Sequence, residues 1–281
     1  MTAQQGSLAA GRLLGGELRR LREAAGLSRE AVARHLDCHA SKVTHFENWR
    51  YPVKRPDLES VCRLYGVADR FEELDAIRRV ASQPGWWTRY DLPTWLGDLI
   101  GFEDSAKLER VVELELIPAL LQSEGYARRI MQLGTRSLPP AELDRRVAIR
   151  LERQKRLIAS EPLELSAVIS EAALIRTASD RTVGAEQLRK FITDAALPNV
   201  SLRVLPLTAG LHAVSGSFTL LDFAPDVPLK VAYEEGAVSG RVVDGEGVVQ
   251  SLSGMHGRLR SQALDDEKSL ALVTQLLAQQ N

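Results

Sequence analysis

Residues 28–49 read SREAVARHLDCHASKVTHFENW, and this stretch decides the fold of the N-terminal part of the chain. Ser28 suits the N-cap of a first short helix. After a tight turn, Val43 and Phe46 lie three residues apart and face inward on a second helix over residues 40–49. Two short helices joined in this way predict a helix-turn-helix unit, whose second helix fits the major groove of DNA.

The polar residues of this predicted recognition helix face outward and are candidates for contacting DNA bases. They are Ser41, Lys42, Thr44 and His45. Lysine can donate to guanine O6 and N7, and serine and threonine suit several bases. Other basic residues are expected to hold phosphates, which position a protein without reading sequence. They are Arg29, Arg34, Arg50, Lys54 and Arg55. Trp49 and Tyr51 are interpreted as packing residues.

Charge and periodicity indicate a DNA-binding domain over residues 1–82. Residues 1–56 hold ten Lys and Arg against five Asp and Glu, although the net charge of the whole chain is −1. Leucines spaced four and three apart predict a helix that ends at Gly26, which suits a left-handed C-cap. Apolar positions in 58–65 and a capping-box pattern at 69–72 predict two more helices, which makes five in all.

Seven residues of this region fit the sequence pattern of a known group of helix-turn-helix proteins. They are Ser28, Ala33, Leu36, Ser41, Val43, Glu47 and Pro56. On these residues the domain resembles the Xre and lambda-repressor-like family of helix-turn-helix regulators. The family commonly has glycine at Asp37 and near residues 48–50, and a small N-cap at His39. Asp37 and Asn48 can still adopt the left-handed conformation, because both are among the residues that tolerate it.

Composition excludes several classes of protein. Hydrophobic residues make up 44% and charged residues 26% of the 281 residues, as in soluble globular proteins of about two domains. Because the sequence has neither a signal-peptide pattern nor an apolar run of membrane-spanning length, we expect a cytoplasmic protein. Cys38 and Cys62 are too few for a structural zinc site, and we interpret them as small buried hydrophobes rather than a redox sensor. We expect no cofactor and no metal.

Residues 83–85, Gln-Pro-Gly, break the helical pattern and mark a second domain over residues 83–281. Four segments alternate like strands: 163–169, 200–204, 218–220 and 229–233. Residues 98–158 and 188–195 have helical periodicity. These patterns predict an α+β effector and oligomerisation domain with a small, mainly antiparallel sheet.

Several blocks of sequence in the second half occur in the same order as in a known group of proteins. They are 85–87, 99–103, 116–127, 171–174, 198–200 and 216–218, with Ala106, Arg150, Arg153, Gln154, Leu205, Pro206, Gly210 and His212. On these blocks it resembles the uncharacterised domain that follows an Xre-type helix-turn-helix in many actinobacterial regulators, including the WhiJ-like proteins. The resemblance implies a transcription regulator, often encoded beside a small partner protein, and it supplies no catalytic site.

Residues 241–249 allow two interpretations. Asp244-Gly245 suits the turn of a hairpin. The family pattern instead begins a helix near Gly247, and the apolar positions that follow fit one, so the helix is preferred. A last helix is expected to begin at Asp265 and Asp266.

The chain contains none of the common hydrolase, P-loop or dinucleotide-binding motifs. His212, Glu171 and a nearby serine, Ser215 or Ser217, could be assembled into a hydrolytic triad on paper. Since geometry defines a triad, a structural role for His212 is preferred and no enzyme is expected.

The effector of the regulator is left open by the sequence. A repressor that senses a ligand, a regulator that docks a partner protein, and an antitoxin-like protein that neutralises a small partner and autoregulates its operon all fit. Trp86, Trp87 and Trp95 are candidates for an effector pocket or partner interface, with core packing as the alternative. We expect a homodimer that presents two recognition helices roughly 34 Å apart on a pseudo-palindromic site. Residues 98–158 or the C-terminal helices are its expected contacts.

Overall fold

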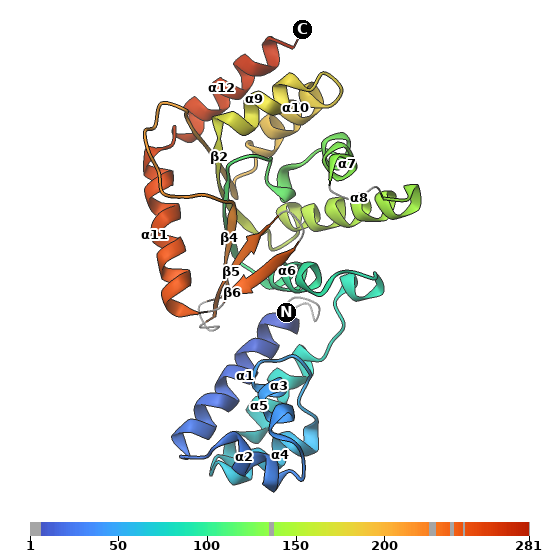
Figure 1. Ribbon diagram of the computed structural model, residues 1–281, viewed down its shortest axis with the longest axis vertical. Helices are drawn as coiled ribbons and strands as arrows, with labels where there is room; N and C mark the ends of the chain where they lie inside the picture. Colours follow the sequence, from blue (N-terminus) through green and yellow to red (C-terminus); the bar gives the residue numbers. More distant parts are fainter. Residues whose placement is uncertain (1–6, 135–137, 225–228, 237–238, 244, 281) are drawn as a thin grey trace. The chain divides into compact units, whose positions relative to one another are not determined.

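The computed structural model describes residues 7–134, 138–224, 229–236, 239–243 and 245–280 (Figure 1). The chain forms two compact units, Met1–Ser105 with Ala224–Leu229, and Ala106–Phe223 with Lys230–Asn281. Each unit has its own hydrophobic core. The domain boundary predicted after residue 82 stays a prediction, and the first compact unit continues to Ser105.

The first unit is built from helices (Figure 1). They are α1 (Ser7–Ala24), α2 (Arg29–His35), α3 (Ala40–Glu47), α4 (Arg55–Leu64), η1 (Ala68–Arg70), α5 (Phe71–Ala81), η2 (Trp86–Arg89) and α6 (Thr94–Ser105). The five helices predicted before residue 82 are α1–α5. Both α5 and α6 pack against α1.

Glycines of α1 determine how closely α3 can approach it. A Cβ atom added to Gly15 would lie 2.4 Å from the carbonyl oxygen of Glu47, and one added to Gly11 would lie 2.0 Å from Nε1 of Trp49. Gly26, with a φ of +68°, ends α1 in the left-handed conformation as predicted. Leu14 and Leu18 of α1 are fully buried beneath these contacts.

The second unit contains a six-stranded mixed sheet (Figure 1). Its strands are β1 (Leu108–Glu113), β2 (Glu164–Ser170), β3 (Val200–Leu205), β4 (Phe218–Asp222), β5 (Lys230–Glu235) and β6 (Gly240–Val243), in the order β3-β2-β1-β4-β5-β6. β1, β2 and β3 are parallel, whereas β4, β5 and β6 join by antiparallel pairing.

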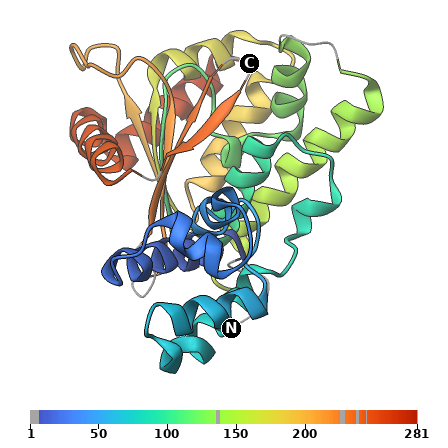
Figure 2. The same ribbon diagram turned by 60° about the horizontal axis from the view of Figure 1, so that its bottom comes forward.

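Helices and short 3₁₀ turns cover this sheet. They are η3 (Ala119–Leu121), α7 (Glu124–Leu133), α8 (Pro140–Gln154), η4 (Lys155–Ile158), α9 (Glu171–Ser179), α10 (Gly184–Asp194), α11 (Glu246–Gln262) and α12 (Asp266–Ala278). Figures 1 and 2 show α11 on one face of the sheet and α7, α8 and α10 on the other. The parallel strands follow from the two helical crossovers, β1 to β2 and β2 to β3.

The sheet is larger than the small one predicted, and within the described residues three of its pairings are antiparallel and two are parallel. The four predicted strands are present as β2–β5, β1 was not expected, and β6 falls on the first arm of the hairpin that was the alternative for residues 241–249. β1 lies within residues 98–158, which were predicted to be helical. Charged residues interrupt its alternation, and Arg110 is neutralised by Asp222 of the neighbouring β4, with Nη2 and Oδ2 2.7 Å apart. Because Asp222 lies 112 residues after Arg110, the sequence around β1 does not show that this charge is neutralised.

The C-terminal helices agree with the preferred interpretation. α11 begins at Glu246, as the helical reading of this region predicts, and β6 pairs with β5. Asp244 of the alternative hairpin lies outside the described residues. Asp265 is the N-cap of α12, where its carboxylate accepts a hydrogen bond from the Lys268 amide at 2.8 Å. Within the described residues, the helices are too short or too polar to cross a membrane.

Candidate nucleic-acid interface

The turn between α2 and α3 has the conformation that its sequence predicts. Ser28 Oγ accepts a hydrogen bond from the Ala31 amide at 3.1 Å and so caps α2. Asp37 has a φ of +50°. The Cys38 amide then donates to the Ala33 carbonyl at 2.9 Å, which closes the end of α2. The prediction for Asp37 is confirmed.

The end of α3 uses Trp49, and not Asn48, for the left-handed conformation. Asn48 keeps a φ of −97°, and Trp49 instead takes the left-handed conformation with a φ of +51°. The Arg50 amide donates to the His45 carbonyl at 2.8 Å, so α3 closes in the same way as α2. The buried indole of Trp49 lies against Gly11 of α1. This tertiary contact, rather than intrinsic preference, determines which residue takes the left-handed conformation.

The two faces of α3 separate as predicted. Val43 is fully buried and Phe46 is 2% exposed. Ser41 and Lys42 are exposed, and Thr44 and His45 are half-buried. The predicted base-contacting residues thus share the accessible side of one short helix, although their contact with bases stays a prediction.

Lys42 is held by a residue that the sequence did not single out. Its Nζ lies 2.8 Å from Oδ2 of Asp57 in the first turn of α4. The hydrogen bond to Asp57 raises the pKa of Lys42, so the ammonium stays charged. Contact between Lys42 and DNA must therefore compete with Asp57.

Thr44 and His45 have different local partners. Thr44 Oγ1 donates to the Ala40 carbonyl at 3.2 Å, which uses the hydroxyl proton, so Thr44 can meet a base by accepting a hydrogen bond or by apolar contact of its methyl group with a thymine methyl. The rings of His45 and Tyr51 meet edge to face, with centroids 5.2 Å apart. Since Tyr51 is 65% exposed, its interpretation as a packing residue is wrong, and it extends the accessible face beyond α3.

The five residues expected to hold phosphates fall into two groups. Arg34, Arg50 and Lys54 are exposed, and within the described residues none of their side chains has a hydrogen bond or ion pair. Arg29 donates from Nε to Glu47 at 2.8 Å, and Arg55 lies 3.5 Å from Asp75 and over the ring of Phe71. The first group is therefore available for phosphates, while the second group also stabilises the fold.

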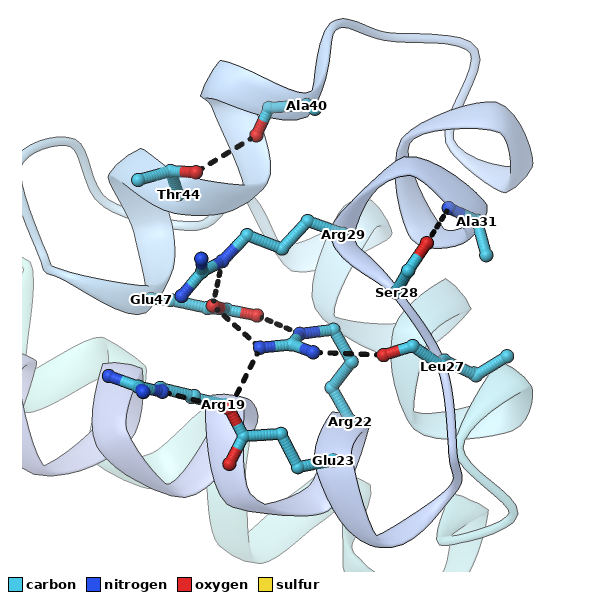
Figure 3. Close-up of polar contacts among 10 residues, drawn as sticks. All are labelled: Arg19, Arg22, Glu23, Leu27, Ser28, Arg29, Ala31, Ala40, Thr44 and Glu47. Atoms are coloured by element: carbon cyan, nitrogen blue, oxygen red, sulfur yellow. Dashed lines mark hydrogen bonds and ion pairs between the residues drawn. The ribbon is translucent and has the colours of Figure 1, made fainter.

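Glu47 joins three helices from within the core (Figure 3). Its side chain is 0% exposed, and its carboxylate lies 2.5 Å from Arg22 Nε on α1 and 2.8 Å from Arg29 Nε on α2. Arg22 also donates to the Leu27 carbonyl at 2.8 Å and to Glu23 at 3.2 Å. This network fixes the recognition helix to the rest of the domain, because a buried carboxylate is stable only with its cations in place.

Sequence reasoning placed Glu47 in the family pattern but did not find its partner Arg22. The bonded carboxylate of Glu47 raises the pKa of Arg22 still further, so the pair stays ionised. A signal was present, because Arg22 lies four residues after Leu18 on the apolar side of α1. An arginine on such a face requires a buried anion.

The tryptophans named as effector candidates lie in the first unit. Trp87 is 8% exposed, whereas Trp86 and Trp95 are half-buried. Trp86 and Trp87 meet edge to face with centroids 6.0 Å apart, and Trp86 Nε1 donates to Asp104 at 3.2 Å. Their role in sensing an effector stays a prediction.

In the part of the chain that the structure describes, the residues of the hydrolytic triad considered from the sequence are not bonded to one another. Ser217 Oγ donates to Glu113 at 2.5 Å, and Glu171 accepts from the Leu207 amide at 2.8 Å. His212 is exposed and, within the described residues, has no hydrogen bond. Burial raises the pKa of the Cys62 thiol to about 11, which keeps it protonated and unreactive. The described residues bring together no cluster of metal-ligating side chains.

Comparison with known families agrees with this geometry. A family model described as a domain of unknown function, DUF5753, matches residues 96–275, more than half of the chain. The chain belongs to this family. A second model, described as a helix-turn-helix domain, matches residues 13–74, which include α2 and α3 of the DUF5753 protein. A helix-turn-helix domain indicates a DNA-binding regulator. No curated protein and no solved structure matches the chain.

Proposed function

We propose that this DUF5753 protein is a transcriptional regulator that reads a specific DNA sequence with α3. The accessible face of α3 carries the proposal. Its polar residues project from a helix whose inner face is buried and whose last turn is tied to α1 and α2 through Glu47. A rigid helix with exposed polar residues near its N-terminus is what base readout in the major groove requires.

Lys42 gives the sharpest test of this face. If Lys42 reads a base, Lys42→Ala weakens specific binding by about 1 to 3 kcal/mol and relaxes preference at one position of the site. Uniform weakening on all sequences would make Lys42 a phosphate contact instead. Lys268→Ala is the matched control, because Lys268 on α12 is paired with Asp265 at 2.9 Å, and this variant should bind DNA like the wild type.

Salt dependence separates the phosphate contacts from the base contacts. Affinity should fall steeply between about 50 and 200 mM salt, because each neutralised phosphate releases counterions. Arg34→Ala, Arg50→Ala and Lys54→Ala should each lower the steepness of this dependence. An unchanged slope in all three variants would remove these residues from the interface.

The other parts of the proposal rest on the family resemblance and on the side-chain placements above. The regulator acts as a repressor and as a homodimer, is related to the WhiJ-like regulators, and responds to a ligand or to a small partner protein through residues 83–281. It has no enzymatic activity of its own, which is consistent with the separate partners of Ser217 and Glu171. Native mass spectrometry of the full chain with and without DNA tests the dimer.

A further inference from the structure

A hollow of about 320 Å³ lies within the first unit, beside the residue that ends the recognition helix. Its walls include Leu8, Trp49, Trp87, Gly97 and Asp98. Pockets of roughly 300 to 1,000 Å³ with mainly apolar walls and a few polar groups are typical of small-molecule sites. This hollow is at the lower end of that range, so it suits a compact compound.

Asp98 is the charged group in the hollow. It is half-buried on α6, and within the described residues its carboxylate has no hydrogen bond or ion pair. Burial raises the pKa of Asp98, while the charge of Arg12 partly opposes this effect. A carboxylate that is withdrawn from water without a hydrogen-bond donor is destabilised in its charged form. A cation in the hollow would give the carboxylate the hydrogen-bond donor and the opposite charge that it lacks.

The aromatic walls favour the same kind of compound. Trp49 and Trp87 are each 8% exposed and line the hollow together with Asp98. Indole is the aromatic ring that attracts cations most strongly. We propose that this hollow binds a small organic ammonium compound, with Asp98 as its counter-ion and the two indoles as its walls, and that its occupancy acts on α3 through Trp49.

Trp49 provides the physical link between the hollow and the recognition helix. Its φ of +51° closes α3, and its indole both lies against Gly11 and lines the hollow. A compound in the hollow therefore touches the residue whose conformation sets the end of α3. Binding in the hollow is independent of the proposed function, whereas its effect on DNA rests on that function.

Binding is tested by calorimetric titration of the full chain with phenethylammonium, with 2-phenylethanol and phenylacetate as uncharged and anionic matches. We expect the ammonium to bind at least about tenfold more tightly than the alcohol, because it gains a charge-assisted hydrogen bond. Asp98→Asn should remove this preference, and Asp91→Asn, which changes an exposed residue outside the hollow, should retain it. Equal affinities, or a preference that survives Asp98→Asn, would overturn the proposal.

Gly97→Phe tests the location of the site. A Cβ atom at Gly97 meets nothing within 4 Å, so a larger side chain can occupy the hollow and should abolish binding of the ammonium. Gly16→Phe is the control, because Gly16 on α1 is equally open and lies outside the hollow. If Gly97→Phe fails to fold by circular dichroism, the comparison of Asp98→Asn with Asp91→Asn still decides.

The link to α3 is tested by measuring DNA affinity with the hollow saturated by phenethylammonium. The dissociation constant for DNA should change by about fivefold or more in the wild type and stay constant in Gly97→Phe. An unchanged constant in the wild type overturns the link to α3. Absence of specific DNA binding both with and without the ammonium contradicts the proposed function and leaves the binding result for the hollow intact.

Discussion

One buried cluster of the helix-turn-helix unit and one of the DUF5753 domain satisfy their polar groups by different chemistry. In the helix-turn-helix unit, two arginines converge on the carboxylate of Glu47. In the DUF5753 domain, neutral amides hold the loop that follows β1. Gln187 accepts from the Ser123 amide and donates to the Leu121 carbonyl, both at 2.7 Å, and Gln122 donates to the Ile117 carbonyl at 2.7 Å.

The two clusters therefore respond differently to the loss of one partner. A buried ion pair is intolerant of losing one partner, because the remaining charge stays in the core, so Glu47 makes three helices behave as one body. Neutral amides fix a backbone at a lower cost for each group. The backbone groups that these amides hold lie within residues 116–127, which carry much of the family resemblance. We infer that the likeness in this segment reflects residues that fix the conformation of the loop.

Removing the charge at the centre of the helix-turn-helix unit should have the largest effect. Glu47→Ala leaves Arg22 buried without its anion and should lower the free energy of unfolding of the first unit by about 3 to 5 kcal/mol. Urea unfolding followed by tryptophan fluorescence measures this, because all four tryptophans lie in the first unit. Glu23→Ala also removes a partner of Arg22, but an exposed one, and should have little effect. Equal losses in the two variants would contradict the central role of Glu47.

Removing an amide from the DUF5753 domain should cost less. Gln187 is fully buried, and Gln187→Leu leaves the Ser123 amide and the Leu121 carbonyl without partners. The expected loss is about 2 to 4 kcal/mol, from two unsatisfied groups. Urea unfolding followed by circular dichroism measures it, with Gln275→Leu on the exposed side of α12 as the control. A loss as small as that of the control would show that the loop relaxes to water.

Glu113 at the end of β1 should make the DUF5753 domain depend on pH. Burial raises its pKa from 4.5 to about 7, despite the hydrogen bond from Ser217. Because the folded domain holds this proton more tightly than the unfolded chain, stability should fall as pH rises from about 4.5 to about 7, by at most about 3 kcal/mol.

The Glu113→Gln variant isolates this contribution. It cannot lose a proton, so the difference in unfolding free energy between wild type and variant should change over that pH window and stay constant above it. Urea unfolding at a series of pH values gives this difference. If it is the same at pH 5 and pH 8, Glu113 is already charged at the lower pH and its pKa is not raised.

The two regions also offer matched helix caps, for which the smallest effects are expected. Ser28 caps α2 and Ser170 caps α9. The Oγ atom of each serine accepts a hydrogen bond from a backbone amide nitrogen at 3.1 Å. Replacing either serine with alanine should lower stability by about 1 kcal/mol. Only Ser28→Ala should also weaken DNA binding in a mobility-shift assay. If Ser170→Ala weakened it equally, the reading of DNA would not be confined to the first unit.

The sequence predicted what depends on local pattern and missed what depends on distant partners. Ser28, Gly26 and Asp37 take their predicted conformations because capping and left-handed backbone are local properties. Trp49 rather than Asn48 becomes left-handed because its indole packs on Gly11, 38 residues earlier. β1 was missed because the neutralising partner of its Arg110 lies on β4.

The candidate site was predictable to a similar extent. The outward face of α3 was found by periodicity, since Val43 and Phe46 alone determine which side is buried. Asp57 was not found, because its role exists only once its carboxylate lies beside Lys42, and Arg22 was overlooked although its place on the apolar side of α1 was a signal. Tyr51 was misjudged, since nothing in its neighbourhood in the sequence shows that it is exposed.

The claim that α3 reads DNA sequence is tested most directly by selecting bound duplexes from a random pool with the full-length protein. The account predicts enrichment of one recurring motif, bound on the order of 10³-fold or more tightly than a scrambled duplex, in two half-sites roughly 34 Å apart. Repeating the selection with Lys42→Ala should change the preference at one position of each half-site. A pool that stays unenriched, with equal affinity for selected and scrambled duplexes, would contradict it.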